Sequence, residues 1–182
     1  SMSSVPSLRA DAARAALYHR CIRPGDRMMP TRHDLRESLT RAGEQGLALL
    51  DRLSDGDLAR ETTNERWCVR EHLVHLVNSE PGLCRTIRAA LKDEWVIPED
   101  FDLDRWNQRQ VERNNDLLLS DLRREFAVNR AATLALLEEL TDVDFDRQAR
   151  HASLKVLSLG EFFQIIENHQ YEHLGAVEAA LA

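Results

Sequence analysis

Apolar residues recur at intervals of three and four through most of the chain after residue 30, which is the period of amphipathic helices. A first helix is predicted to start near Thr31. Its apolar positions are Leu35, Leu39, Ala42, Gly46, Leu49 and Leu50. A second helix is predicted to begin after Trp67, because Cys68 stands where an N-cap belongs and Glu71 follows three residues later, as in a capping box. Its apolar face consists of Val69, Leu73, Leu76, Val77 and Leu83.

The rest of the chain predicts two further helical regions. Residues 103–140 contain an apolar stripe, with a break expected at residues 114–115, where two asparagines stand together. The last helix is predicted over residues 159–181. Within the second helix, Pro81 and Gly82 are expected to cause a kink or a break, because proline removes a backbone donor and clashes with the preceding turn.

Four long amphipathic helices with few strand signals predict an all-α fold, a four-helix bundle over residues 30–182. Residues 51–64 and 141–158 are predicted as loops. The long connections at residues 93–103 and 141–158 can cross the ends of the bundle, so an up-down-up-down order with short turns is not required. Residues 1–29 lack a comparable pattern and are expected to form an N-terminal extension, either disordered or with a short helix.

Composition and charge narrow the function further. The 182 residues have a formal net charge of -7, and an acidic surface disfavours binding to nucleic acids. No apolar run approaches the roughly 20 residues of a membrane helix, and no signal-peptide pattern is present. We therefore expect a cytoplasmic protein that binds neither nucleic acid nor membrane. The three cysteines match no zinc or CxxC spacing and are predicted to be reduced thiols.

Histidines provide the candidate chemistry. His169 and His173 are four residues apart, so on a helix they project from one face at about 40° from each other. Such a pair can grip a metal ion from one side, with a third ligand from another helix. His75 lies near core-facing positions of the second helix and is a candidate for that ligand. The alternatives are that the pair is only polar surface and that His75 is a core histidine with ordinary partners.

The other histidines are weaker candidates. His72 is predicted to be a surface residue of the second helix, and His19 and His33 are predicted to be solvated. His151 precedes the last helix and is expected to be a loop residue, or else to line the mouth of a pocket or approach the metal. Pocket-lining positions are also considered for Trp106, Asn107, Tyr171 and Glu172.

Four segments, in order, resemble the DinB/YfiT-like superfamily of metalloenzymes. Residues 67–76, with Glu80 following, resemble the signature W-S-x-x-E-x-L-x-H-L-x-x-x-E. Residues 101–107 look like a segment of the branch that contains mycothiol-dependent maleylpyruvate isomerase. Residues 151–163 resemble the lead into the last helix of the family, and residues 169–173 match its closing H-x-x-x-H. Together the resemblance covers the chain from about residue 30 to its end.

The resemblance implies a specific site. In this family three histidines bind a divalent metal, so His75, His169 and His173 are the implied ligands, and the bundle is implied to have up-down-down-up order, often as a homodimer. The metal stays open among Zn, Ni and Fe, since imidazole suits all of them. Cys68 departs from the Ser or Thr of the signature. It is expected to be either a substitute cap or a reactive thiol at a helix N-terminus.

The resemblance also implies a metal-dependent enzyme that acts on a small-molecule substrate. Three protein ligands leave a coordination position open, which suits catalysis. Members of the family use low-molecular-weight thiols such as mycothiol or bacillithiol, so a thiol-dependent transferase or isomerase with such a cosubstrate is the first expectation.

Three alternatives stay open. The first is a metal-dependent hydrolase, because residues 169–173 have the form HxxEH, in which Glu172 would be the catalytic base. That motif needs a further ligand downstream, and only nine residues follow His173. The second is a non-enzymatic small-molecule binding protein in stress or toxin resistance. The third is a bundle whose site has lost its metal.

Overall fold

The computed structural model describes residues 30–63 and 67–182, so the predicted extension at residues 1–29 lies outside the described residues. The elements, in chain order, are α2 (Arg32–Leu50), η1 (Asp55–Ala59), α3 (Val69–Ala90), α4 (Leu103–Arg113), α5 (Leu119–Glu139), η2 (Asp142–Asp146), β1 (Gln148–Arg150), β2 (Val156–Ser158) and α6 (Leu159–Ala180). None of the helices in the described ranges combines the length and apolar character needed to cross a membrane.

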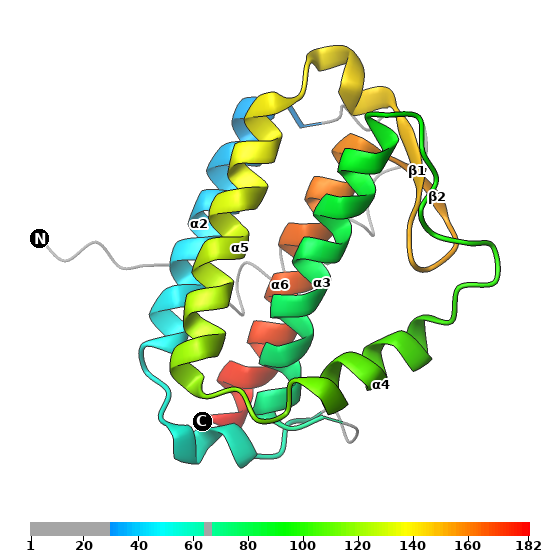
Figure 1. The fold of residues 1–182 in the computed structure, drawn as a ribbon. Helices are drawn as coiled ribbons and strands as arrows, with labels where there is room; N and C mark the ends of the chain where they lie inside the picture. Colours follow the sequence, from blue (N-terminus) through cyan, green and yellow to red (C-terminus); the bar gives the residue numbers. More distant parts are fainter. Residues whose placement is uncertain (1–29, 64–66) are drawn as a thin grey trace, which may run out of the picture.

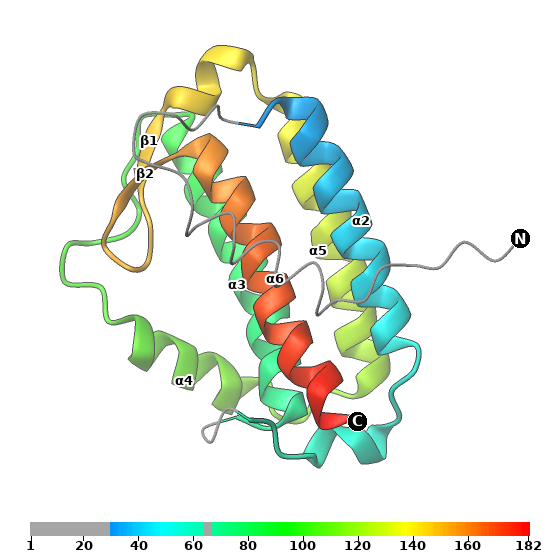
Figure 2. The same cartoon turned by 180° about the vertical axis from the view of Figure 1, so that it is seen from behind.

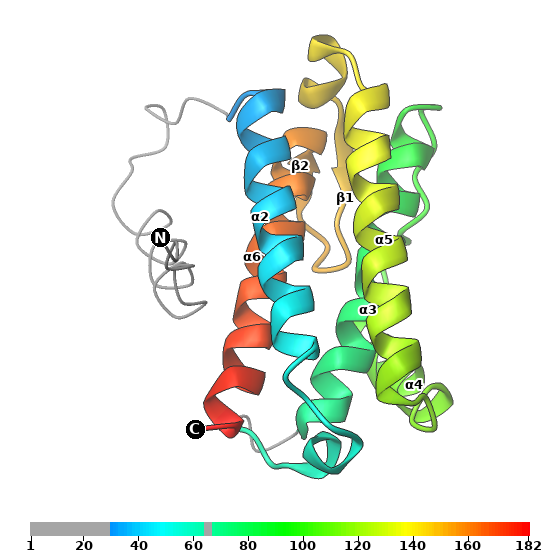
Figure 3. The same ribbon diagram turned by 90° about the vertical axis from the view of Figure 1, so that its left-hand side faces the viewer.

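The long helices α2, α3, α5 and α6 form the predicted four-helix bundle. Helices α2 and α6 run in one direction and α3 and α5 in the other, which confirms the up-down-down-up order (Figures 1 and 2). Figure 1 shows α2 beside α5 and α6 beside α3, and the quarter turn of Figure 3 shows α2 beside α6 and α5 beside α3. Because α3 and α5 are parallel, the chain must return along the bundle between them, and α4 lies in that return.

The helix starts agree with the sequence prediction. Thr31 caps α2, and its backbone N–H donates to the carboxylate of Asp34 at 2.9 Å. Cys68 is the N-cap of α3, and its N–H donates to Glu71 at 2.7 Å. These contacts satisfy backbone donors that have no partner inside the helix. They therefore fix where the histidine-bearing turns of α3 begin.

The sequence predicts a kink or a break at Pro81, and the break does not occur, because α3 is one unbroken helix across this residue. Proline lacks the N–H that would bond to the carbonyl four residues earlier, which is that of Val77. The Asn129 side chain of α5 donates to this carbonyl at 2.8 Å instead. A neighbouring helix thus satisfies the orphaned acceptor, and α3 can continue to Ala90.

The break predicted at residues 114–115 and the loop predicted at residues 141–158 have different outcomes. The break near residues 114–115 is confirmed, since α4 ends at Arg113 and α5 begins at Leu119. Residues 141–158 are not a plain loop: they contain η2 and a hairpin in which Ala149 pairs with Leu157. Strands of three residues are too short to produce a recognisable alternation of apolar and polar positions.

The bundle core consists mainly of aliphatic side chains and phenylalanines from all four long helices. Helix α2 approaches α5 closely at Gly46, where an added Cβ would lie 2.4 Å from the Phe126 ring. A ring in a packed core cannot move aside at low cost, so this position requires glycine. Its fully buried large side chains include Leu35, Leu39, Leu49, Leu73, Ile87, Leu122, Leu136, Leu137, Phe162 and Phe163.

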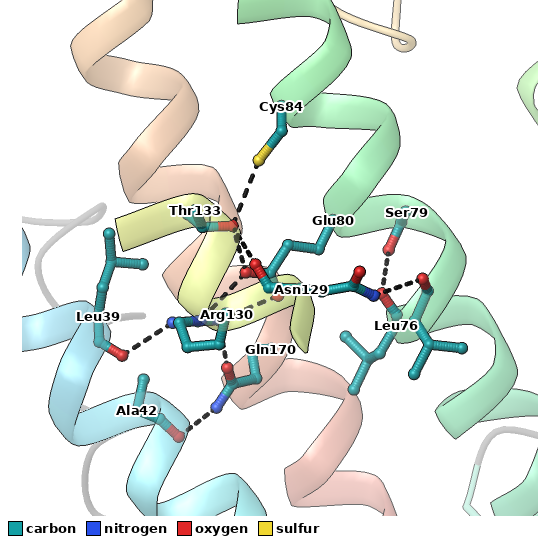
Figure 4. A network of polar contacts seen from close by, with 11 residues as sticks. Leu39, Ala42, Leu76, Ser79, Glu80, Cys84, Asn129, Arg130, Thr133 and Gln170 are labelled. Carbon is teal, nitrogen blue, oxygen red and sulfur yellow. Dashed lines mark hydrogen bonds and ion pairs between the residues drawn. The ribbon is translucent and has the colours of Figure 1, made fainter. Parts of the chain in front are cut away.

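A charged network crosses the centre of this apolar core (Figure 4). Arg130 of α5 forms a two-pronged ion pair with Glu80 of α3, at 3.0 and 3.2 Å, and both side chains are buried. Arg130 also donates to the Leu39 carbonyl of α2 at 2.9 Å and to the side-chain carbonyl of Gln170 on α6. Thr133 donates to Glu80 at 2.6 Å. One guanidinium therefore connects all four helices.

We expect R130M to lower the free energy of unfolding by about 3–5 kcal/mol, because it leaves the Glu80 carboxylate buried without its cation. The double variant E80M/R130M should lose clearly less than the sum of the two single variants, since it leaves no buried charge. Urea denaturation followed by circular dichroism measures all three values.

The control is R36M. Arg36 also joins α2 to α5, through an ion pair with Glu138 at 3.2 Å, but both side chains are exposed. This substitution should change stability little. If R130M costs no more than R36M, the buried network does not stabilise the bundle in the way described.

Candidate metal centre

Three histidines from two helices converge at one point of the bundle. His75 lies in the first third of α3, and His169 and His173 lie one turn apart on α6. One ring nitrogen from each can be chosen so that all of them lie within 4.8 Å of one another. The ring of His173 lies 4.7 Å from that of His75 and 4.5 Å from that of His169, between centroids. The structure thus brings together the predicted ligands, and their role as ligands stays a prediction.

The closest contact in this group joins the two helices directly. The Nε2 atoms of His75 and His169 are 2.8 Å apart. Trp67, just before α3, covers the group: its ring lies 4.8 Å from that of His75 and stacks on that of His173 at 5.4 Å. The histidines are therefore partly closed off by an aromatic side chain and by the core.

Burial keeps these imidazoles neutral. Burial, with further repulsion from neighbouring histidines, lowers the pKa of His75 to about 3, and burial with repulsion from His151 lowers that of His169 to about 4. The pKa of His173 is lowered as well, first by burial and then by His169, His75 and His72. A histidine must be neutral to bind a metal, so at neutral pH the group presents lone pairs and not cations.

His72 is not the predicted surface residue. Its side chain is only 2% exposed, and its Nδ1 lies 2.8 Å from the Nδ1 of His173. The other ring nitrogen, Nε2, lies 3.1 Å from the hydroxyl of Thr62. Residues three apart on a helix share a face, so the spacing of His72 and His75 was the signal that pointed inward. Burial lowers the pKa of His72, which also favours its neutral form.

The residues present fit a divalent metal ion. Metal–nitrogen bonds of 2.0–2.1 Å place tetrahedral ligand nitrogens about 3.3 Å apart, so a cluster of three within 4.8 Å needs only small side-chain adjustments. Imidazole nitrogens suit Zn, Ni and Fe. The Nδ1 of His75 is buried without a hydrogen-bond partner among the described residues. Three protein ligands could bind such an ion here, with a position left open toward the adjoining pocket.

A pocket of about 430 Å³ opens beside the three histidines. Apolar and aromatic side chains from α4 and from the segment before it form much of its wall, and Arg85 and Glu172 supply charges of opposite sign. Its lining includes Trp67, Leu83, Thr86, Val96, Ile97, Phe101, Leu103, Trp106, Asn107, His151 and Ile165. The volume and the mixed lining are those of a small-molecule site.

Four of the five side chains that were considered for the pocket from the sequence line it. Trp106, Asn107, His151 and Glu172 line it, as considered from the sequence. Tyr171 does not: it is 3% exposed and packs in the apolar core. Leu83, Arg85 and Thr86 also line the pocket and were not predicted to do so, because their contribution depends on how α4 and its connection fold back over α3.

The polar groups near the pocket have defined hydrogen-bonding roles. The Nδ1 of His151 receives the backbone N–H of Ser153 at 3.1 Å, so a neutral His151 holds its proton on Nε2 and is a hydrogen-bond donor there. The Cys68 thiol has a raised pKa, because it is partly buried. Cys68 is therefore better explained as a replacement for the usual Ser or Thr at the N-cap than as a reactive thiolate.

The fold and the histidine group together define a helical bundle with a candidate metal centre between two of its helices. The chain belongs to the DinB superfamily, whose family model matches residues 38–177. Among curated proteins, the uncharacterized protein YuaE of Bacillus subtilis strain 168 is 27% identical over 136 residues, covering 69% of this chain and 84% of YuaE.

Two solved structures show the same fold. YfiT from Bacillus subtilis, described as a probable metal-dependent hydrolase with an unusual four-helix bundle topology, has a TM-score of 0.69 at 18% identity, over 87% of this chain and 91% of YfiT. The mycothiol-dependent maleylpyruvate isomerase has a TM-score of 0.63 at 20% identity, over 83% of this chain. This chain spans only 64% of that isomerase.

We expect the metal-free protein to lose stability as the pH falls from about 6.5 toward 4. In the unfolded chain His75 and His169 take up protons near their ordinary pKa of 6.5, whereas in the folded protein they do so only near 3 and 4. Protons therefore bind the unfolded state first, and each histidine that stays neutral costs up to about 1.4 kcal/mol per pH unit. Urea denaturation at several pH values, with chelator present, measures this slope.

The variant H169Q removes one of these groups. It should reduce the dependence of the free energy of unfolding on pH by the contribution of one histidine. The control for a histidine-to-glutamine change is H33Q, which replaces an exposed histidine of α2. A free energy of unfolding that is flat between pH 6.5 and 5 would contradict the burial of neutral imidazoles.

Proposed function

We propose that this chain is a metal-dependent enzyme that acts on a small molecule in the 430 Å³ pocket, and that its reaction uses a low-molecular-weight thiol. One observation supports this more than any other: neutral imidazoles of His75, His169 and His173 meet at the wall of a largely apolar pocket. A purely structural metal site has four protein ligands and no open position.

The pocket side chains support the binding of a small electrophile with an apolar body. Apolar walls exclude water, and Trp67 and Trp106 provide flat surfaces for a conjugated substrate. His151, a donor at Nε2, can hold an oxygen atom on which negative charge develops. Arg85 lines the same pocket and suits a carboxylate on the substrate or on the thiol.

A divalent ion on the three histidines would lower the pKa of a thiol or water bound to it and hold the anion in place. The protein must then supply orientation and exclusion of bulk water, which the ring of Trp67 and the wall formed by α4 provide. The structural likeness to the mycothiol-dependent isomerase shows the shared fold, at 20% identity. It is consistent with the proposal that a low-molecular-weight thiol is the cosubstrate.

Hydrolysis is the second candidate, because of Glu172. This residue neighbours His173, is exposed and lines the pocket, so its carboxylate can reach a water molecule there. The HxxEH metallopeptidase pattern takes its further ligand from downstream, whereas here the third histidine comes from α3. In this alternative Glu172 would act as the catalytic base. The thiol reaction does not require Glu172 in that role.

We expect H75A, H169A and H173A each to weaken metal binding by more than the roughly 10- to 100-fold that an outer-shell partner causes. Competition titrations with Zn²⁺ and Co²⁺ and a chelator, at neutral pH, measure the dissociation constants. The matched control is H33A, which removes an exposed histidine and should bind as tightly as wild type. Wild-type affinity in any of the three variants would exclude that residue as a ligand.

A low-molecular-weight thiol should bind directly to the Co²⁺-loaded protein. Sulfur-to-cobalt charge-transfer absorption in the near ultraviolet reports this bond, and the loaded protein should then turn over electrophiles only when the thiol is present. Thiol-independent ester or amide cleavage that is lost in E172Q would instead establish the hydrolase. Binding of metal and pocket ligands without turnover of either panel would indicate a binding protein.

A further inference from the structure

Of the four clustered histidines, His72 is the one that the three-histidine site does not use. It is as well buried as His75, and it contacts the α6 histidine that lies farther along the chain, His173, through Nδ1. Burying a polar group is costly unless it is hydrogen-bonded. The burial of this imidazole between two polar partners therefore calls for an explanation. Its position in the signature quoted above is a variable one, so the family pattern does not account for it.

The backbone carbonyl of Trp67 determines the direction of the hydrogen bonds around His72. The Thr62 hydroxyl lies 2.7 Å from the backbone carbonyl of Trp67, and a carbonyl can only accept. The single hydroxyl proton of Thr62 therefore points to Trp67, and its oxygen is left to accept from His72. Neutral His72 then holds its proton on Nε2, at 3.1 Å from that oxygen.

The tautomer of His72 determines the tautomer of His173. With its proton on Nε2, His72 presents a lone pair at Nδ1, so the 2.8 Å contact requires His173 to donate from its own Nδ1. A neutral His173 with its proton on Nδ1 has its lone pair on Nε2. Nε2 is then the nitrogen of His173 that has a lone pair available for a metal ion.

We propose that His72 is a positioning residue for the metal centre: with Thr62 it holds His173 in the tautomer and ring orientation that leaves Nε2 free to bind the metal. This inference rests on the proposed metal site. Outer-shell partners of metal-bound histidines act in this way, by fixing the tautomer and raising the basicity of the ligand. His75 has no such partner at Nδ1 among the described residues, so it lacks the kind of contact that His72 makes with His173.

The test uses three substitutions of His72 in the full chain. H72N keeps an acceptor close to the place of Nδ1, H72Q places its amide near Nε2 and offers no acceptor at Nδ1, and H72L offers neither. We expect H72L and H72Q to raise the Zn²⁺ and Co²⁺ dissociation constants about 10- to 100-fold, and H72N to recover most of the loss. The variant T62V should have a smaller effect of the same sign.

Two further readouts separate this role from others. The ligand-field spectrum of Co²⁺ and the number of imidazoles found by X-ray absorption should stay as in wild type, because His72 acts through His173. In metal-free protein, ¹⁵N NMR of His173 should show the proton on Nδ1 in wild type and H72N, but a mixture of tautomers in H72L. This second readout remains valid even if the wild-type protein binds no metal.

The outcomes are distinct. Loss of one imidazole ligand in H72L would make His72 a direct ligand and overturn the proposal, as would unchanged affinity in H72L with the fold intact by circular dichroism. Equal weakening in H72N and H72L, or a His173 proton on Nε2 in wild type, would overturn it as well. Failure of wild-type protein to bind Zn²⁺ or Co²⁺ would instead count against the proposed function.

Discussion

The packing of α3 against α6 is the contact on which the candidate chemistry depends. It places the Nε2 atoms of His75 and His169 2.8 Å apart and surrounds both with apolar and aromatic side chains. In such surroundings an imidazole cannot easily gain a proton, and the buried rings must find partners in one another or in an ion. The same packing that completes the core thus produces a group of neutral nitrogen ligands.

The buried network around Arg130 supports this contact from the opposite side of the two helices. Gln170, which receives a hydrogen bond from Arg130, is the residue next to His169, and Glu80 lies five residues beyond His75 on α3. A slip of α3 along its axis would break the buried ion pair, and a slip of α6 would break the hydrogen bond to Gln170. Either slip would also break the histidine contact. Charge burial and site geometry therefore constrain the same two helices, and a misplaced register is disfavoured twice.

Much of this architecture can be predicted from local patterns. Helical periodicity and the cap position at Cys68 located the helices, and the spacing of His169 and His173 placed both on one face of α6. Which helices are neighbours is a different question. Periodicity does not show that α3 and α5 are parallel, and the up-down-down-up order came from the resemblance to a known family.

The errors have physical causes of the same kind. Pro81 continues a helix because Asn129, far away in sequence, satisfies the freed carbonyl. His72 is buried because Thr62 and His173 are placed around it by a loop and by another helix. The pocket walls come from α4 and its connection, whose return path no local pattern specifies. Each error concerns a partner distant in the chain, which is information that a single sequence does not contain locally.

The most direct test of the central claim is a crystal structure of metal-loaded protein, with anomalous diffraction recorded on both sides of the absorption edge of the metal. We predict a single strong peak between α3 and α6, bonded at about 2.0–2.2 Å to one nitrogen of each of His75, His169 and His173, with His72 outside the bonded set. A peak elsewhere in the molecule, or no peak at full metal loading, would contradict the account.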